Sequence, residues 1–177
     1  MKIDLRILDP RLPGWGFPSW GSNLAAGLDL HACLDYPLIL QPQAPAVLIS
    51  AGIAFHIGDP EWCALVLPRS GLGHKQGLVL GNAVGVIDAD YEGPCLISAW
   101  NRNPGGPLGS HISNAQEIEI RPGDRIAQLV FTRIARPEFA IVAGFAESGS
   151  RQETGSRQES GFGSTGIEAA CPDSLPG

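Results

Sequence analysis

The 177-residue chain lacks several features that would place it in other classes of protein. No apolar run approaches the roughly 20 residues that cross a bilayer, and the start, MKIDLRILDPRLPG, has no signal-peptide core. Its four cysteines lie far apart, at 33, 63, 95 and 171, without a CxxC pair. This spacing argues against a zinc site or a disulfide framework and favours reduced thiols. We therefore expect a cytoplasmic protein with no membrane partner.

Basic charge is also scarce. The formal net charge is −6 and the isoelectric point is about 5.1, whereas sequence-independent nucleic-acid binding needs a basic surface. We therefore expect no nucleic-acid partner. A phosphate ligand remains possible because it needs only a few local donors. Long helices are missing as well, since no window of 12 or more residues has an amphipathic helical pattern.

Short apolar runs bounded by Gly and Pro make up most of the chain. The 23 Gly and 15 Pro disfavour helices and suit tight turns between strands. Many short strands in one domain predict an all-β fold, a jelly-roll-like barrel or sandwich. At most one short helix is expected, after Lys75. The expected strands are 2–7, 46–57, 62–67, 94–100, 117–120, 125–134 and 138–142.

Two polar stretches divide the chain. Residues 103–116 (NPGGPLGSHISNAQ) predict a surface loop that is an insertion between strands. From residue 146 the composition changes, and GSRQET is followed directly by GSRQES before GFGSTG at 161–166. Such a segment buries too little apolar area to offset its chain entropy. We therefore expect a β domain over 1–145 and a flexible C-terminal tail over 146–177, with 161–166 able to fold onto a ligand.

Two central motifs could carry chemistry. PRSGLGHKQG at 68–77 places an Arg and a Ser next to glycines, which suits an anion because the guanidinium and backbone N–H groups can both donate. On its own, such a sequence is more often a plain turn. GVIDADYEGP at 85–94 places Asp88 at the end of an apolar strand, where a fixed and partly desolvated carboxylate could orient water. Alternatively, Asp88 and Asp90 are solvated turn residues.

Two further motifs each place polar groups in an apolar strand. In AGLDLHA, at 26–32, Asp29 must find an Arg or a metal-bound water, because an unpaired buried carboxylate is expensive. In GDRIAQLVF, at 123–131, we expect Arg125 to form an ion pair and Gln128 a hydrogen bond at a sheet edge.

Taken in order, AGLDL, PRSGLG, GxIDxDYxG, GDRIAQ and GFGSTG strongly resemble the five motifs of the dUTP pyrophosphatase (dUTPase) family, over about residues 2–166. The resemblance implies a homotrimer of jelly-roll subunits whose active sites are shared between chains. It implies hydrolysis of dUTP to dUMP and pyrophosphate with Mg²⁺ as cofactor. This reaction would keep uracil out of DNA and supply dUMP for thymidylate synthesis.

The resemblance also assigns roles to residues. It implies that Asp88 activates the water that attacks the α-phosphorus, and that Asp29 holds a water of the Mg²⁺, which sits mainly on the triphosphate. A β-hairpin around 82–96 would bind the base and sugar through Asn82, Val86, Ile87, Tyr91 and Leu96. The phosphates would lie against Arg69, Ser70, Gly71 and Gln128 of a neighbouring subunit. The tail would close over the nucleotide with Arg157, Phe162, Gly163, Ser164 and Thr165.

The tail departs from the family pattern. Gln158 and Ser160 stand where the family usually has glycines, and the duplication makes Arg151 a rival to Arg157. Two other functions are alternatives. The related dCTP deaminase shares the fold but uses an acid in the strand after the hairpin, where this chain has Leu-Ile-Ser-Ala at 96–99. The other alternative is a non-catalytic, nucleotide-responsive binding protein, although every catalytic residue type is present.

Overall fold

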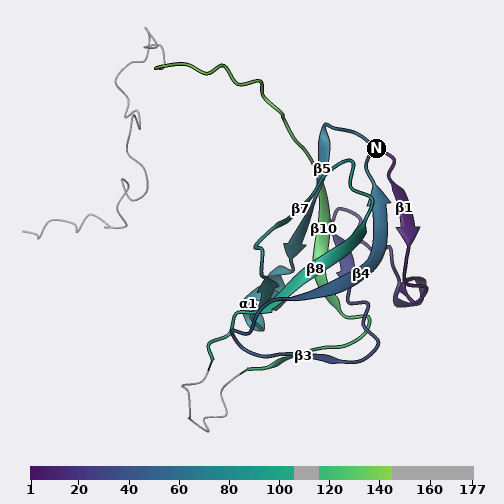
Figure 1. The fold of residues 1–177 in the computed structure, drawn as a ribbon. Coiled ribbons are helices and arrows are strands. Elements are labelled where there is room, and N and C mark those ends of the chain that lie inside the picture. The colour runs from purple at the N-terminus through teal and green to yellow at the C-terminus, as the bar shows by residue number, and fades with distance from the viewer. Residues whose placement is uncertain (106–115, 145–177) are drawn as a thin grey trace, which may run out of the picture. The chain divides into compact units, whose positions relative to one another are not determined.

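A computed structural model of the chain describes residues 1–105 and 116–144. It contains a compact unit, Met1–Arg136, and a second unit from Pro137, of which only 137–144 are described. The regular secondary structure of the compact unit is mostly strand (Figure 1). Its elements in chain order are β1 (Asp4–Ile7), η1 (Leu12–Trp15), β2 (Leu28–His31), β3 (Leu38–Leu40), β4 (Val47–His56), β5 (Trp62–Pro68), α1 (Ser70–Lys75), β6 (Leu78–Leu80), β7 (Gly85–Ile87), β8 (Pro94–Asn101), β9 (Ile118–Ile120) and β10 (Arg125–Arg133).

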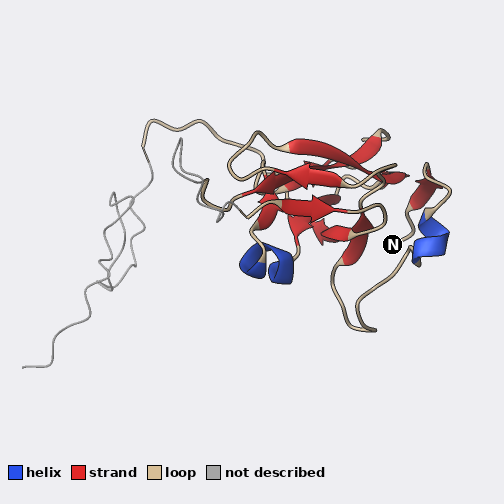
Figure 2. Cartoon of the chain, turned by 90° about the horizontal axis from the view of Figure 1, so that it is seen from below, coloured by secondary structure: helices blue, strands red, loops and turns tan. Residues whose placement is uncertain are grey.

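The strands form two four-stranded antiparallel sheets and one small two-stranded sheet. The sheets have the orders β1-β4-β8-β6 and β2-β10-β5-β7, and β3 pairs with β9. Neighbours in a sheet are therefore distant in sequence, and the chain passes repeatedly from one sheet to the other. Figure 2 shows the strands layered through the unit with the two short helices at its margins. The expected fold class, an all-β jelly-roll-like sandwich, is confirmed.

The core lies between the two large sheets. Alternate residues of β8 are buried, which is the period-two pattern of a strand that has one face in a core. The largest fully buried side chains come from both sheets, among them Leu30, Ile49, Ile97 and Leu129. Cys95 packs in the same core, and burial raises the pKa of its thiol to about 12.

No helix in the described part of the chain has the length and apolarity to span a membrane.

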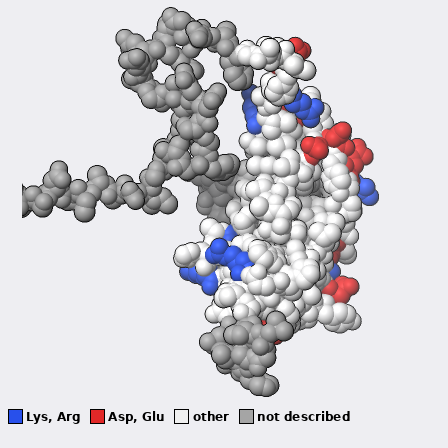
Figure 3. Space-filling model, turned by 60° about the vertical axis from the view of Figure 1, so that its left-hand side comes forward, with Lys and Arg blue, Asp and Glu red and all other residues white. Residues whose placement is uncertain are grey.

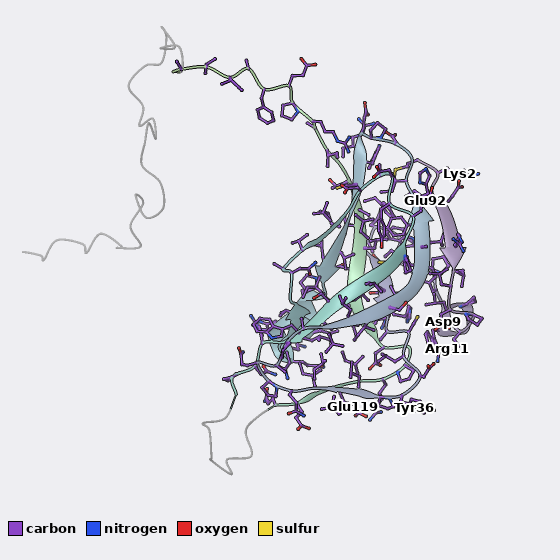
Figure 4. All side chains as sticks on the ribbon, viewed as in Figure 1. Lys2, Asp9, Arg11, Tyr36, Glu92 and Glu119 are labelled. Atoms are coloured by element: carbon purple, nitrogen blue, oxygen red, sulfur yellow. The ribbon has the colours of Figure 1, made fainter. Side chains whose placement is uncertain are left out.

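An ion-paired corner joins β1 to the rest of the unit. The Arg11 guanidinium donates to both oxygens of the Asp9 carboxylate, with Nε–Oδ1 at 2.9 Å and Nη2–Oδ2 at 2.6 Å. Its Nη1 donates to the backbone oxygen of Leu34 at 2.9 Å, so the corner is tied to the segment after β2. Figure 4 shows Asp9 and Arg11 side by side at this corner. The Arg11 hydrogen bonds lower the pKa of Asp9 to about 2.

Several expected elements need correction. The helix lies at Ser70–Lys75 rather than after Lys75, and the expected strand at 138–142 is not formed. Phe139 and Ile141 are almost fully exposed, because the segment 138–142 pairs with no strand of the described residues. The short strands β3 and β6 were missed, since three residues are too few to show a period.

The fold makes a prediction about acid stability. Because the pKa of Asp9 is lower in the folded chain than its ordinary value of 3.8, the ionised carboxylate stabilises the fold above that pH. This contribution disappears as the pH falls from 3.8 to about 2. Asp9→Asn should therefore destabilise the protein near neutral pH, and the difference from wild type should shrink towards pH 2.

Urea unfolding of both proteins over that pH range checks this prediction. Asp35→Asn is the matched control, because Asp35 also pairs with Arg11, at 3.2 Å, but is 82% exposed. That control should leave the free energy of unfolding nearly unchanged, since solvent screens an exposed pair. A difference between Asp9→Asn and wild type that stays constant with pH would contradict the assignment.

Candidate functional site

The Arg-Ser-Gly motif forms the junction between β5 and α1. Arg69 keeps extended backbone angles (φ −84°, ψ 126°) directly after β5, and the helix begins at Ser70. The carbonyl of Arg69 accepts from the N–H of Gly73 at 2.9 Å, which closes the first turn. The motif is therefore a strand-to-helix junction and not the plain turn that its composition favours.

Asp29 lies in β2, two strands away from β5 in the same sheet, and pairs with two guanidinium groups. Its Oδ1 lies 3.2 Å from Nε of Arg69, and its Oδ2 accepts from Nη1 of Arg125 at 3.0 Å. The Asp29 side chain is only 10% exposed, whereas the Arg69 and Arg125 side chains are 31% and 49% exposed. Asp29 thus has the arginine partner that its burial requires. The ion pair expected of Arg125 is confirmed.

These residues line a cavity of about 820 Å³. It carries three basic side chains, those of Arg69, Lys75 and Arg125, against the single carboxylate of Asp29, so it suits an anion larger than one phosphate. Its lining residues are Gly21, Ala25, Ala26, Gly27, Asp29, Arg69, Ser70, Gly71, Leu72, Lys75, Gln76, Arg125, Gln128 and Val130. Figure 3 shows scattered basic and acidic side chains on a largely uncharged face.

Gln128 also lines this cavity. It faces Asp29 across the β10–β2 pairing, and its Nε2 donates to the backbone oxygen of Pro68 at 3.0 Å. The expected hydrogen bond is confirmed, but its place is not, because β10 is an inner strand of its sheet. Asp29, Arg69, Ser70, Gly71 and Gln128, five of the residues singled out from sequence, therefore meet at one cavity.

The other predicted site residues that the structure describes lie in the segment 82–96, in which β7 and β8 do not pair as the expected hairpin. β7 pairs with β5 in one sheet, whereas β8 pairs with β4 and β6 in the other. The turn after Ile87 therefore crosses between the sheets. It is fixed by a hydrogen bond from the Tyr91 N–H to the Asp88 carbonyl at 3.2 Å and by one from the Tyr91 hydroxyl to the Pro94 carbonyl at 3.1 Å.

Asp88 and Asp90 are exposed turn residues, which is the alternative interpretation of this motif. β7 lies at a sheet edge, so Asp88 is exposed rather than partly desolvated at the end of a buried strand. Val86, Tyr91 and Leu96 are 64%, 45% and 46% exposed. None of these residues lines the 820 Å³ cavity in the described part of this single chain. The site residues therefore fall into two groups, one at the cavity and one on the crossing segment.

Asn82 and Ala83 form a tight bend at the start of this segment. Ala83 has a positive φ of 60°, and the Val84 N–H donates to the Asn82 carbonyl at 2.6 Å, which is a γ-turn. The Asn82 side chain is exposed next to this turn. Arg157, Phe162, Gly163, Ser164, Thr165 and the alternative Arg151 lie outside the described residues.

The sequence reasoning missed Lys75 and Gln76 as cavity residues. Both are brought to the cavity by α1, a helix of six residues that is too short to give a periodic signal. Within the ranges 1–105 and 116–144, no group of three or more His, Cys, Asp or Glu side chains is placed to hold a metal ion. A metal at this cavity would therefore depend on ligand oxygens and water.

Comparisons with known proteins decide the family. The family model described as dUTPase matches residues 15–166, a range that includes all five motifs. The chain belongs to the dUTPase family. The recognition made from the motifs is confirmed, and with it the expected enzyme class, dUTP diphosphatase.

Relatives cover almost the whole chain. A deoxyuridine 5′-triphosphate nucleotidohydrolase of Xylella fastidiosa is 48% identical over 166 residues, covering 93% of this chain and 95% of the relative. One from Burkholderia lata is 46% identical, covering 94% and 99%. Among solved structures, a Staphylococcus bacteriophage 80alpha dUTPase mutant with dUpNHpp has a TM-score of 0.72 and 26% identity, covering 94% and 99%. A mutant dUTPase from phage phi11 of S. aureus, whose structure concerns a structural Mg(II) ion, has a TM-score of 0.68 and 26% identity, covering 83% and 100%.

The packing of Gly27 gives a prediction about this site. A Cβ added at Gly27 would collide with Oε1 of Gln128, so Gly27→Ala should displace that side chain and break its hydrogen bond to Pro68. We expect the free energy of unfolding to fall by about 1 kcal/mol. Urea unfolding measures it, with Gly14→Ala as control, because no atom lies within 4 Å of a Cβ built there. Equal stability of Gly27→Ala and wild type would contradict the packing.

Proposed function

We propose that this protein hydrolyses dUTP to dUMP and pyrophosphate by attack of water on the α-phosphorus, as a homotrimer with shared active sites. The observation that carries the proposal is the basic cavity at which Asp29, Arg69, Ser70 and Gln128 converge. The family membership and the activity for which the relatives are named support the same substrate. In the cell, the reaction would keep uracil out of DNA and provide dUMP for thymidylate synthesis, in the cytoplasm.

The cavity is suited to the triphosphate. Arg69 offers charge-assisted donors, and the Ser70 hydroxyl and the Gly71 backbone stand beside it at the start of α1. Gln128 is fixed by its bond to Pro68, so its remaining polar atoms have a defined direction. A group of fixed donors around the phosphates stabilises the negative charge that develops when the α-phosphorus is attacked.

The crossing segment is suited to the nucleoside. Asn82 and the backbone near Val86, Ile87 and Leu96 would form hydrogen bonds with the uracil edge, and the Tyr91 ring would pack under the deoxyribose. The hydroxyl of Tyr91 is held by Pro94, which fixes the ring in place. A ring packed against the sugar leaves no room for a 2′-hydroxyl, and this accounts for selection of a deoxynucleotide.

Asp88 is the proposed general base. It would accept a proton from the attacking water, and the pyrophosphate would leave from the opposite side of the α-phosphorus. In a single chain Asp88 is exposed and lies on the other group of site residues from the cavity. A second copy of the chain that brings its cavity to this segment would cover Asp88, Val86, Tyr91 and Leu96 together. This division of the site supports the shared sites of a homotrimer.

The described residues fit Mg²⁺ carried by the substrate. Both Asp29 oxygens are already paired with guanidinium groups, Oδ1 in an ion pair with Arg69 and Oδ2 as the acceptor of a hydrogen bond from Arg125, which leaves lone pairs for a metal-bound water but disfavours direct ligation. This cation usually keeps several waters and binds through substrate phosphates. When bound, it would neutralise part of the triphosphate charge. The tail, proposed as residues 146–177 after a β domain of 1–145, would contribute Arg157, Phe162, Gly163, Ser164 and Thr165 to the closed site.

Deamination of dCTP is the alternative from the same fold. β8, where the deaminase would need its acid, contains no carboxylate. Assays of dUTP, dTTP, dCTP and UTP with and without Mg²⁺ separate the two reactions. Pyrophosphate from dUTP alone supports the proposal, and ammonia from dCTP would replace it with the deaminase.

The role of Asp88 has a direct test. Asp88→Asn removes the base but keeps the size of the side chain, so kcat should fall about a hundredfold or more. Binding of a non-hydrolysable imido analogue of dUTP, measured by calorimetry, should stay close to wild type. Glu92→Gln is the control, because Glu92 is an exposed carboxylate on the same turn, 3.3 Å from His56 (Figure 4). Near-normal turnover of Asp88→Asn would show that the base is a different group.

A further inference from the structure

Arg125 is held in the site by an irregularity in β10. Gln128 pairs with Asp29 and Ala127 with Leu30, but the next partner of His31 is Arg125, so Ile126 is an extra residue. This is a β-bulge, in which two residues of one strand oppose one of the other. Ile126 and Ala127 are both buried, which regular alternation would not allow on a strand with one core face.

The bulge decides which face Arg125 occupies. In a regular strand, residues three apart point to opposite faces, so Arg125 would point away from Gln128 and Asp29. Because of the extra residue Ile126, Arg125 lies on the same face of the sheet as Gln128 and Asp29. Its Nη1 then reaches the Asp29 Oδ2 at 3.0 Å.

Arg125 also holds Arg69 directly. The backbone oxygen of Arg125 accepts from Nη1 of Arg69 at 2.7 Å, and Asp29 lies 3.2 Å from Nε of the same guanidinium. Two of the three guanidinium nitrogens of Arg69, Nη1 and Nε, are therefore held by other groups. Its Nη2 has no acceptor within residues 1–105 and 116–144, and Arg69 lines the 820 Å³ cavity.

We propose that Arg125 is a positioning residue that, through Asp29 and its own carbonyl, aims the free edge of Arg69 at the phosphates. This inference rests on the proposed function, because it assigns Arg69 to the triphosphate. Asp29 is nine-tenths buried and has two oxygens to satisfy. Without the Arg125 side chain, the guanidinium that still contacts Asp29 is that of Arg69, through Nε. This guanidinium would turn towards a two-bond pairing with Asp29 and withdraw a donor from the cavity.

The test is a double-mutant cycle on dUTP hydrolysis with Arg125→Met and Arg69→Met. If Arg125 acts through Arg69, Arg125→Met alone should lower kcat/KM by roughly 100-fold. In the Arg69→Met background the same change should then have little further effect. Losses that multiply in the double variant would mean that Arg125 acts on the substrate independently, and they would overturn the proposal.

Variants and controls separate positioning from folding. Arg125→Lys keeps a charge beside Asp29, so it should recover part of the loss; it also replaces Arg125→Met in the cycle if that protein does not fold. Arg121→Met is the matched control, because Arg121 forms a similar ion pair with Glu119 at 3.0 Å but is 68% exposed, and its kcat/KM should equal wild type.

The same assays distinguish failure of the proposed function from failure of the positioning role of Arg125. Wild-type protein that releases no pyrophosphate from dUTP would refute the proposed function. Active wild type with an equally active Arg125→Met would leave that function intact and refute the positioning role alone. The expected result is a loss in Arg125→Met, a smaller loss in Arg125→Lys, wild-type activity in Arg121→Met and a sub-additive cycle with Arg69→Met.

Discussion

The pairing of one buried carboxylate with two arginines organises this site. Asp29 sits in β2, Arg69 follows β5 and Arg125 begins β10, so the three residues tie together three strands of one sheet. Because an unpaired carboxylate at that depth is costly, the sheet and the cluster depend on each other. The cluster also leaves the cavity with excess positive charge on groups whose directions are fixed. A preorganised set of donors of this kind is what phosphate chemistry requires.

The proposed site residues fall into two groups, one at the cavity and one on the crossing segment. The cavity residues lie around β2, α1 and β10, whereas Asp88 and Tyr91 lie on a turn that crosses from one sheet to the other. In a single chain Val86, Tyr91 and Leu96 of this segment are 64%, 45% and 46% exposed. Exposure of the proposed nucleoside-binding surface next to the proposed base is understandable if another copy of the chain supplies the cavity. The same division explains why neither the motif at 68–77 nor the motif at 85–94 indicated a complete site when considered alone.

Much of the fold and of the cavity could be predicted from the sequence. The long strands β4, β5, β8 and β10 were recognised because each is a largely apolar run of seven or more residues. The partner of Asp29 could be anticipated because a carboxylate in an apolar strand must be neutralised. The bulge at Ile126 could not, since it depends on pairing with a strand that lies much earlier in the chain. The choice between a partly desolvated and a solvated Asp88 could not be made either, because the sequence of β7 does not reveal that it is an edge strand.

Mixed trimers test the central claim, that each active site joins the Arg69 cavity of one chain to the Asp88 turn of another. Chains carrying Arg69→Met and chains carrying Asp88→Asn, each inactive alone, are co-expressed in equal amounts and purified as one assembly through two different tags. If sites are shared between chains, each mixed trimer should contain one complete site of three, so about a third of wild-type dUTP turnover per site should be restored. Mixed trimers that remain as inactive as either parent would contradict a shared site and place both residues in one chain.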